Sequence, residues 1–190
     1  MESAGTQWID TGIAPTNTIG LMVKYNKSSA QSTDQVVVGY ADFTEQNIYV
    51  NPATNNLLIP FSQTYYTANF GRFNYDTDYE VSMNYMNNRK RFVNGSSFLD
   101  IDKTYPSGVT NTMYLFAGNY NNSPNWRFIG RVYYLQITDN SSLVRNMIPV
   151  RRNSDNVLGM YDLVSRTFFT NSGTGTFVAG PVASYVPQNQ

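Results

Sequence analysis

The sequence predicts an all-β protein, an antiparallel sandwich of two sheets, and three observations lead to this fold class. Short segments that alternate apolar and polar residues recur along the 190 residues, and a period of two places successive side chains on opposite faces of a strand. Asn, Gly and Pro separate these segments at the spacing of turns. No segment combines a helical period with capping residues. A chain of many short strands buries its apolar side chains by packing one sheet against another.

The predicted strands before residue 120 differ in how clearly the sequence marks them. Residues 18–25 alternate cleanly, with apolar side chains from Ile19 to Tyr25 on one face. Residues 35–40 are rich in valine, which is typical of a central strand. Asn94-Gly95 is the strongest two-residue hairpin signal in the chain. The other predicted strands cover residues 7–9, 47–50, 56–61, 65–73, 79–86, 89–93, 97–101 and 113–118.

Residues 130–137 are the strand around which the sandwich is expected to be organised, after a long polar loop at 119–125. Strict alternation divides its side chains into two faces, Tyr133, Leu135 and Ile137 against Val132, Tyr134 and Gln136. Both faces carry apolar or aromatic side chains, so we expect cover on both sides and a neighbouring strand at each edge. A turn at Asp139-Asn140 then leads into a further strand at residues 143–149.

Composition limits the chemistry and the partners of the protein. The chain has no cysteine and no histidine, which excludes disulfides, zinc–thiolate sites, cysteine nucleophiles and histidine-based triads. The formal net charge is zero, and no run of basic side chains follows a phosphate backbone, so nucleic acid is not an expected partner. No apolar segment approaches the roughly 20 residues of a membrane span, so membrane insertion is not expected.

Two stretches near the ends of the chain resemble a known family. The first is Glu2-Ser-Ala-Gly-Thr-Gln-Trp-Ile-Asp-Thr-Gly-Ile13. The second contains G-R-V-Y-Y-L-Q-I at 130–137, L-V-R-N-M-I-P at 143–149, G-M-Y-D at 159–162 and F-x-N-S-G-T-G-T-F at 169–177. These motifs are similar to lectin-like jelly-roll domains, which include concanavalin A-like and laminin-G-like modules. Such domains recur in phage tail, fibre and other virion proteins and in surface proteins of gut bacteria.

The resemblance covers nearly all of the chain and implies a single jelly-roll domain at residues 1–181, followed by a C-terminal tail or linker remnant at 182–190. It also implies a virion surface, or an extracellular or cell surface, as the location. Residues 1–12 lack the basic start and apolar stretch of a signal peptide, and a chain without cysteine can fold in a reducing cytoplasm. We therefore expect release by a route such as lysis, or a domain cut from a longer chain. We favour the second, because Met1 directly precedes the family-like motif.

The favoured function is a noncatalytic recognition module for a glycan or a cell-surface receptor. Sugars present apolar C–H faces and many hydroxyls, so a sugar site needs aromatic rings beside groups that donate and accept hydrogen bonds. The segment from Asn119 to Trp126 combines both kinds of side chain. A tryptophan beside a strand is as often a core residue, so Tyr120 is the stronger expected contact. The candidate ligand-binding residues are Asn119, Tyr120, Asn121, Asn122, Trp126, Tyr65, Tyr66 and Tyr75.

Two other functions remain open from the sequence. Laminarinase-type glucanases share the implied fold and carry carboxylates at alternate strand positions, where two of them act on a glycosidic bond. Here Asp76, Asp78 and Glu80 follow that spacing. Only Glu80 is expected clearly within a strand, so we do not expect an enzyme. The second alternative is a structural virion module, in capsid decoration or fibre assembly, that contacts other virion proteins or forms a homo-oligomer.

None of these candidate functions requires a cofactor, although calcium is a candidate ligand. Asp100 and Asp102 could contribute carboxylate oxygens to a calcium site. Laminin-G-like domains often bind calcium at a rim loop, which is why the resemblance draws attention to this pair. Two acids without the spacing of a calcium-binding loop are too few to define a site.

Overall fold

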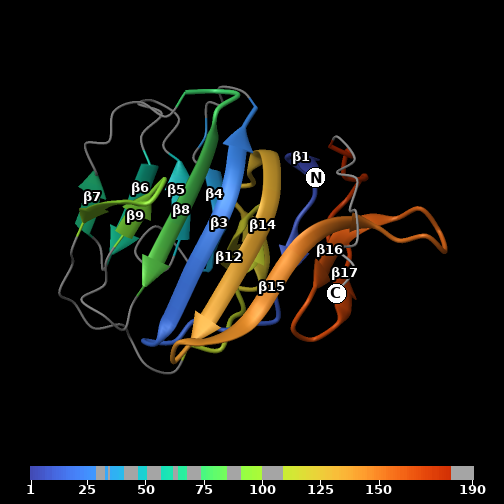
Figure 1. The fold of residues 1–190 in the computed structure, drawn as a ribbon. Coiled ribbons are helices and arrows are strands. Elements are labelled where there is room, and N and C mark those ends of the chain that lie inside the picture. The colour runs from blue at the N-terminus through green and yellow to red at the C-terminus, as the bar shows by residue number, and fades with distance from the viewer. Residues whose placement is uncertain are drawn as a thin grey trace, which may run out of the picture.

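The computed structural model describes residues 1–28, 33, 35–40, 47–50, 57–61, 64–67, 74–84, 91–99 and 109–180. Within these residues the chain forms strands β1–β17 and no helix. The strands make two sheets packed face to face (Figure 1), which confirms the predicted all-β sandwich. We call the nine-stranded sheet the front sheet and the eight-stranded sheet the back sheet.

The front sheet faces the viewer in Figure 1 and carries the longest strands. Its order is β10 (Ser96–Leu99), β9 (Arg91–Val93), β8 (Asp78–Asn84), β3 (Ile19–Lys27), β14 (Ile129–Asp139), β15 (Ser142–Arg151), β16 (Leu158–Asp162) and β17 (Thr167–Phe169), and β1 (Glu2–Ala4) also pairs with β14. The β9–β10 turn is Asn94-Gly95, and both residues have positive φ. This is the backbone that a two-residue hairpin turn requires, so that prediction is confirmed.

The back sheet lies behind the front sheet and is built around β4. Its order is β13 (Ser123–Asn125), β12 (Gly118–Tyr120), β4 (Gln35–Tyr40), β5 (Asn47–Val50), β6 (Leu57–Phe61) and β7 (Thr64–Thr67), and β11 (Tyr114–Leu115) joins β4 to β2 (Ile9–Asp10). Strand β4 is buried along its whole length, as its valine-rich sequence predicts. The predicted strand at 7–9 is partly wrong, because the N-terminal segment forms β1 and β2 instead.

The core lies between the two sheets and consists mainly of apolar side chains. Leu21, Val23 and Tyr25 of β3 contribute from the front sheet. Val37 and Val38 of β4 belong to the same buried cluster and contribute from the back sheet. The clean alternation of residues 18–25 is therefore the pattern of a strand with one face on the core. Burying side chains of this size contributes about 1.5–3 kcal/mol each.

Strand β14 has β3 on one edge and β1 and β15 on the other, as predicted for a central strand. The predicted alternation of its side chains holds from Tyr134 to Ile137 and is wrong for Val132 and Tyr133, because the register shifts at a β-bulge between Val132 and Tyr134. A bulge adds one residue to one strand and so changes which side chains share a face. The residues buried in the core are Val132, Leu135 and Ile137. Tyr133 and Tyr134 both lie on the outer face and are only partly buried. The prediction that both faces of this strand are covered by protein is therefore also wrong.

The two stretches that carry the family resemblance lie against each other. Residue Glu2 exchanges two backbone hydrogen bonds with Val178, at 2.9 and 3.0 Å. The amide of Thr174 donates to the carbonyl of Thr6, and Asn171 Oδ1 accepts from the amide of Trp8. The opening motif and the C-terminal Gly-rich motif therefore form one structural unit that closes the sandwich.

Gly173→Ala is expected to destabilise this closure. A Cβ at position 173 would lie 2.1 Å from the carbonyl oxygen of Thr6, and a backbone atom cannot move away as a flexible side chain can. Overpacking of this kind costs about 1–3 kcal/mol. Thermal unfolding checks this, with Gly180→Ala as the matched control, because its Cβ would meet nothing closer than 3.8 Å. Equal unfolding temperatures for the two variants would contradict the assigned role of Gly173.

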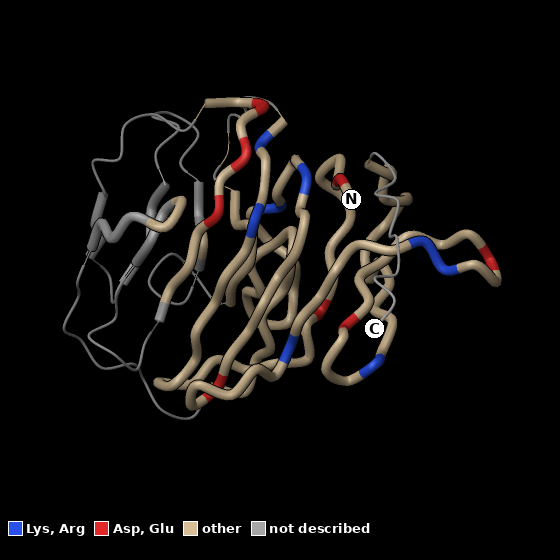
Figure 2. Tube along the Cα trace, viewed as in Figure 1, with Lys and Arg blue, Asp and Glu red and all other residues tan. Residues whose placement is uncertain are grey.

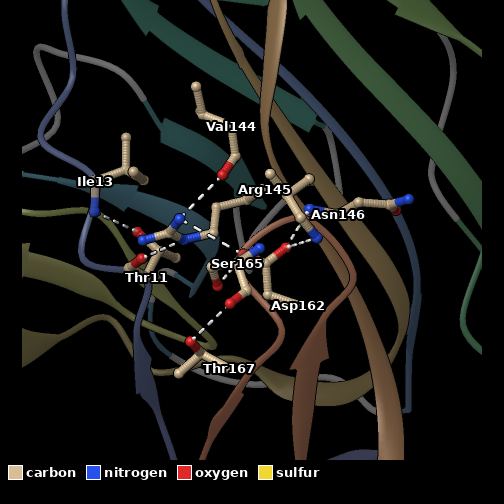
Figure 3. A network of polar contacts seen from close by, with 9 residues as sticks. Thr11, Ile13, Val144, Arg145, Asn146, Asp162, Ser165 and Thr167 are labelled. Atoms are coloured by element: carbon tan, nitrogen blue, oxygen red, sulfur yellow. Dashed lines mark hydrogen bonds and ion pairs between the residues drawn. The ribbon is translucent and has the colours of Figure 1, made fainter.

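The G-M-Y-D motif ends in a buried carboxylate that organises the β16–β17 turn (Figure 3). Asp162 is 0% exposed. Its Oδ1 accepts from the amides of Asn146 at 2.7 Å and Val164 at 3.2 Å, and its Oδ2 accepts from the amide and the hydroxyl of Ser165. Arg145 lies 3.5 Å from Oδ2 and also donates to the carbonyl of Thr11. The motif residue is thus a structural element that links β15, β16 and the N-terminal segment.

Candidate functional site

The segment predicted as a polar loop at 119–125 is a hairpin made of β12 and β13. Gly118 pairs with Asn125, and Tyr120 pairs with Ser123. The turn residues Asn121 and Asn122 have φ of 50° and 59°, and asparagine adopts such left-handed backbone more easily than most residues. The loop prediction is therefore wrong for a local reason, since two asparagines serve here as a two-residue hairpin turn.

The hairpin brings Tyr120 and Trp126 together in an edge-to-face pair. Their ring centroids are 5.8 Å apart with an interplanar angle of 68°, an arrangement that aromatic pairs prefer. Tyr120 is 42% exposed. Trp126 is partly buried, and its ring lies over Gly118, where a Cβ would come within 3.1 Å of Trp126 Cε3. Trp126 is consequently held in place by the hairpin while part of its ring remains open to solvent.

The backbone around Trp126 fixes the ring at the end of β4. Trp126 has φ of 49°, and its carbonyl accepts the amide of Val36 at 2.7 Å. Val36 also forms a bridge with Arg127. These contacts attach the residue to a fully buried strand, so the aromatic pair sits on a rigid scaffold rather than on a free loop.

A groove of about 430 Å³ opens beside this aromatic pair, at one end of the sandwich. Residues from both sheets line it: Ala4, Gly5, Thr33, Gln35, Pro124, Asn125, Trp126, Arg127 and Ile129. Gln35, the first residue of β4, is 1% exposed, and its Oε1 has no hydrogen-bond partner in the described part of the chain. We call Tyr120, Trp126 and this groove the hairpin site.

The structure divides the other predicted ligand-binding residues between different places. Asn119 is fully buried, and its Nδ2 donates to the carbonyl of Thr112 at 2.7 Å, so its side chain points into the protein. Tyr75 is exposed and lies against Lys27 of β3, with the Lys27 Nζ 5.3 Å from its ring centroid. Tyr65 and Tyr66 belong to β7, which is at the opposite edge of the back sheet from β13.

The outer face of the front sheet carries a polar cluster that the sequence analysis did not assemble. A shallow pocket of about 340 Å³ is lined by Lys24, Asp78, Glu80 and Asn94, and Figure 2 shows acidic positions on β8 beside basic positions on β3. The Tyr133 hydroxyl donates to Asp78 Oδ1 at 2.8 Å, and the Tyr134 hydroxyl donates to Glu80. Strict alternation places the two tyrosines on opposite faces, so only the bulge in β14 explains this cluster.

The geometry of the cluster gives Asp78 a structural role. Burial acts to raise the pKa of Asp78, but hydrogen bonds from Asn26 and Tyr133 and the charge of Lys24 hold that pKa below its usual range. Burial and the bond to Glu80 raise the pKa of Tyr134 to about 12. The lowered pKa keeps Asp78 ionised at neutral pH, so Asp78 does not suit the glycosidase role of a carboxyl group that stays protonated to assist the leaving group. Asp76 lies in the preceding turn with φ of 52°, outside β8.

Glu80→Gln is expected to leave sugar binding within about twofold of the wild type. The reason is that Glu80 lies on the front-sheet cluster, where Tyr134 already occupies one of its oxygens, and not in the groove beside Trp126. Titration calorimetry on both proteins checks this prediction. A large loss of affinity in Glu80→Gln would move the sugar site to the front sheet. Measurable glycan hydrolysis that the same substitution abolishes would restore the hydrolase reading.

The calcium candidates Asp100 and Asp102 lie outside the described residues. Among the residues that are described, no group of three or more acidic side chains could hold a metal ion. The same part of the chain contains no helix with the length and hydropathy needed to cross a membrane.

Comparison with known proteins identifies the fold but no family. No family model matches the sequence, and no curated protein matches it. Among solved structures, the chain is similar to a protein from Bacteroides ovatus described as a "putative carbohydrate binding protein", with a TM-score of 0.63 and 14% sequence identity. The similarity covers 96% of this chain and 60% of the Bacteroides protein. The chain therefore shares its sandwich fold with part of a longer protein.

Proposed function

We propose that this protein is a noncatalytic glycan-binding module of the lectin-like jelly-roll kind, and that it binds through the hairpin site. One observation carries the proposal: Tyr120 and Trp126 form a partly exposed aromatic pair directly beside a groove with polar side chains. Aromatic rings take up the apolar face of a sugar, while amides and a guanidinium hydrogen-bond its hydroxyls. The description of the Bacteroides protein makes carbohydrate the first ligand class to test.

The remaining parts of the proposal concern the context of the module. We propose that residues 1–181 form the domain. We expect it to be displayed on a phage virion, in a tail or head fibre, or on a bacterial surface protein. The partners would be a cell-surface glycan or receptor. The direct contact between the two ends of the chain supports a single domain, whereas the expected display and partners rest on the family resemblance of the motifs there.

A glycan array probed with the purified protein tests the function, once with calcium and once with chelator. We expect a restricted set of glycans to bind in both conditions. Binding that chelator abolishes would implicate a metal, with Asp100 and Asp102 as the residues to substitute. Binding to no glycan in either condition would contradict the proposal.

A structural virion module is the second candidate, and one observation favours it. Leu163 and Val164, in the turn between β16 and β17, are 49% and 44% exposed. Exposed apolar side chains that are contiguous mark contact surfaces between proteins. Light scattering during size-exclusion chromatography distinguishes the two functions. A defined oligomer that Leu163→Ser dissociates, combined with an empty glycan array, would establish the structural role instead.

A further inference from the structure

The lining of the groove at the hairpin site combines two kinds of surface. One part is apolar and consists of small or rigid groups: Ala4, Gly5, Pro124, Trp126 and Ile129. The other part offers hydrogen-bonding groups: Thr33, Gln35, Asn125 and Arg127. The groove therefore offers a ligand apolar contacts and hydrogen-bonding groups side by side.

Gln35 supplies the unsatisfied polar group of the groove. Its side chain is 1% exposed, and Oε1 is buried without a partner in the described residues. Buried amide oxygens in native proteins nearly always accept a hydrogen bond, and one that does not do so destabilises the protein. In the described part of the chain, Gln35 combines this property with a position in the lining of the groove. A ligand N–H or O–H that reaches Gln35 would remove that cost.

We propose that the groove receives the acetamido group of an N-acetylated sugar, with Gln35 as its hydrogen-bond partner. This inference rests on the proposed glycan-binding function. An acetamido group carries an amide N–H and a methyl group two bonds from that nitrogen, so it matches an acceptor beside an apolar wall. A hydroxyl at the same sugar position supplies the donor but leaves the apolar wall without a contact. The pyranose ring then lies toward Trp126, which lines the groove and contacts Tyr120 edge to face.

The acetamido group can come from two sources, and Arg127 distinguishes them. Neutral N-acetylhexosamines carry the group alone, whereas N-acetylneuraminic acid carries it together with a carboxylate. Arg127 is exposed at the edge of the groove, and a guanidinium pairs with carboxylates in a bidentate manner. Arg127→Gln should weaken binding of a sialylated trisaccharide by a much larger factor than binding of an N-acetylhexosamine, because only the first loses a charge-paired contact.

The test compares sugars that differ only in this group. N,N′-Diacetylchitobiose, called chitobiose below, and cellobiose have the same β-1,4-linked backbone, with acetamido groups in the first and hydroxyls in the second. We expect the full chain to bind chitobiose at least tenfold more tightly than cellobiose in titration calorimetry. In Gln35→Met, which keeps the length of the side chain and removes its amide, we expect the two affinities to become equal within about twofold.

The outcomes separate this inference from the proposed function. Equal affinity of the wild type for the two disaccharides would overturn the acetamido assignment and leave glycan binding intact. A preference for chitobiose that persists in Gln35→Met would overturn the role of Gln35. No binding of any sugar, here or on the array, would overturn the proposed function and the inference with it. Should Gln35→Met fold poorly, Gln35→Leu also removes the amide without burying a charge, and the same loss of preference is expected.

Discussion

Trp126→Ala is expected to weaken glycan binding by about 30-fold or more, which corresponds to the roughly 2 kcal/mol lost when a central aromatic contact is removed. Trp126 lines the groove and also positions Tyr120 through the edge-to-face contact. The substitution therefore removes the Trp126 ring from the site and leaves the Tyr120 ring without the contact that positions it. Titration calorimetry with a glycan identified on the array measures the loss.

The control for this prediction has to separate binding from folding, because the Trp126 ring also covers Gly118 and approaches the buried β4 strand. Tyr120→Ala provides it, since Tyr120 is 42% exposed and its removal leaves the backbone of the hairpin intact. We expect a smaller loss of affinity in Tyr120→Ala and no change in its unfolding temperature. Full affinity in both variants would show that glycans bind elsewhere.

Asp162→Ala is expected to lower the free energy of unfolding by about 3–5 kcal/mol, the cost of removing one partner from a buried ion pair. Asp162 accepts hydrogen bonds from three backbone amides and one hydroxyl, and Arg145 lies 3.5 Å away. The substitution removes the carboxylate acceptor of these four hydrogen bonds and the ion-pair partner of Arg145, which keeps its bonds to the carbonyls of Thr11 and Val144. Urea denaturation measures the loss. The matched control is Asp155→Ala, because Asp155 pairs with Arg152 at the surface. Equal midpoints for the two variants would contradict the role of Asp162.

The same carboxylate makes stability depend on pH in a defined direction. Burial acts to raise the pKa of Asp162, but the hydrogen bonds from Asn146, Ser165 and Val164 hold that pKa below its ordinary value. A depressed pKa means that the contribution is present above the ordinary carboxyl pKa and is lost as the pH falls through the folded value. We therefore expect Asp162→Asn to reduce the dependence of stability on pH below about pH 4.

The fold could be predicted largely because single strands obey simple alternation. Residues 18–25 became β3 with the expected inner face, and Asn94-Gly95 became the expected hairpin turn. Strand β14 departs from simple alternation, because one extra residue in the bulge turns Tyr133 and Tyr134 toward the same side. Nothing in Val132-Tyr-Tyr-Leu135 marks that bulge, since the bulge depends on pairing with β3 rather than on local preference.

The candidate site was only partly accessible to sequence reasoning. The mixture of rings and amides at 119–126 pointed to Tyr120 and Trp126, which the hairpin brings together. The same composition could not tell Asn119, which faces inward, from Asn121 and Asn122, which form the turn. Gln35 was missed because it stands 91 positions from Trp126 in the chain. Gln35 and Trp126 become neighbours only through the packing of β4 against the hairpin.

Two tryptophans allow the central claim to be tested directly. The chain contains only Trp8 and Trp126, so an ¹⁵N-labelled sample gives two indole N–H signals, which Trp8→Phe assigns. Trp8 packs against Tyr114, with ring centroids 4.1 Å apart, and against the Gly173 loop. On titration with a bound glycan, we predict that the Trp126 indole signal shifts to saturation while the Trp8 signal stays in place. A saturating titration that leaves the Trp126 signal unmoved would contradict binding at the hairpin site.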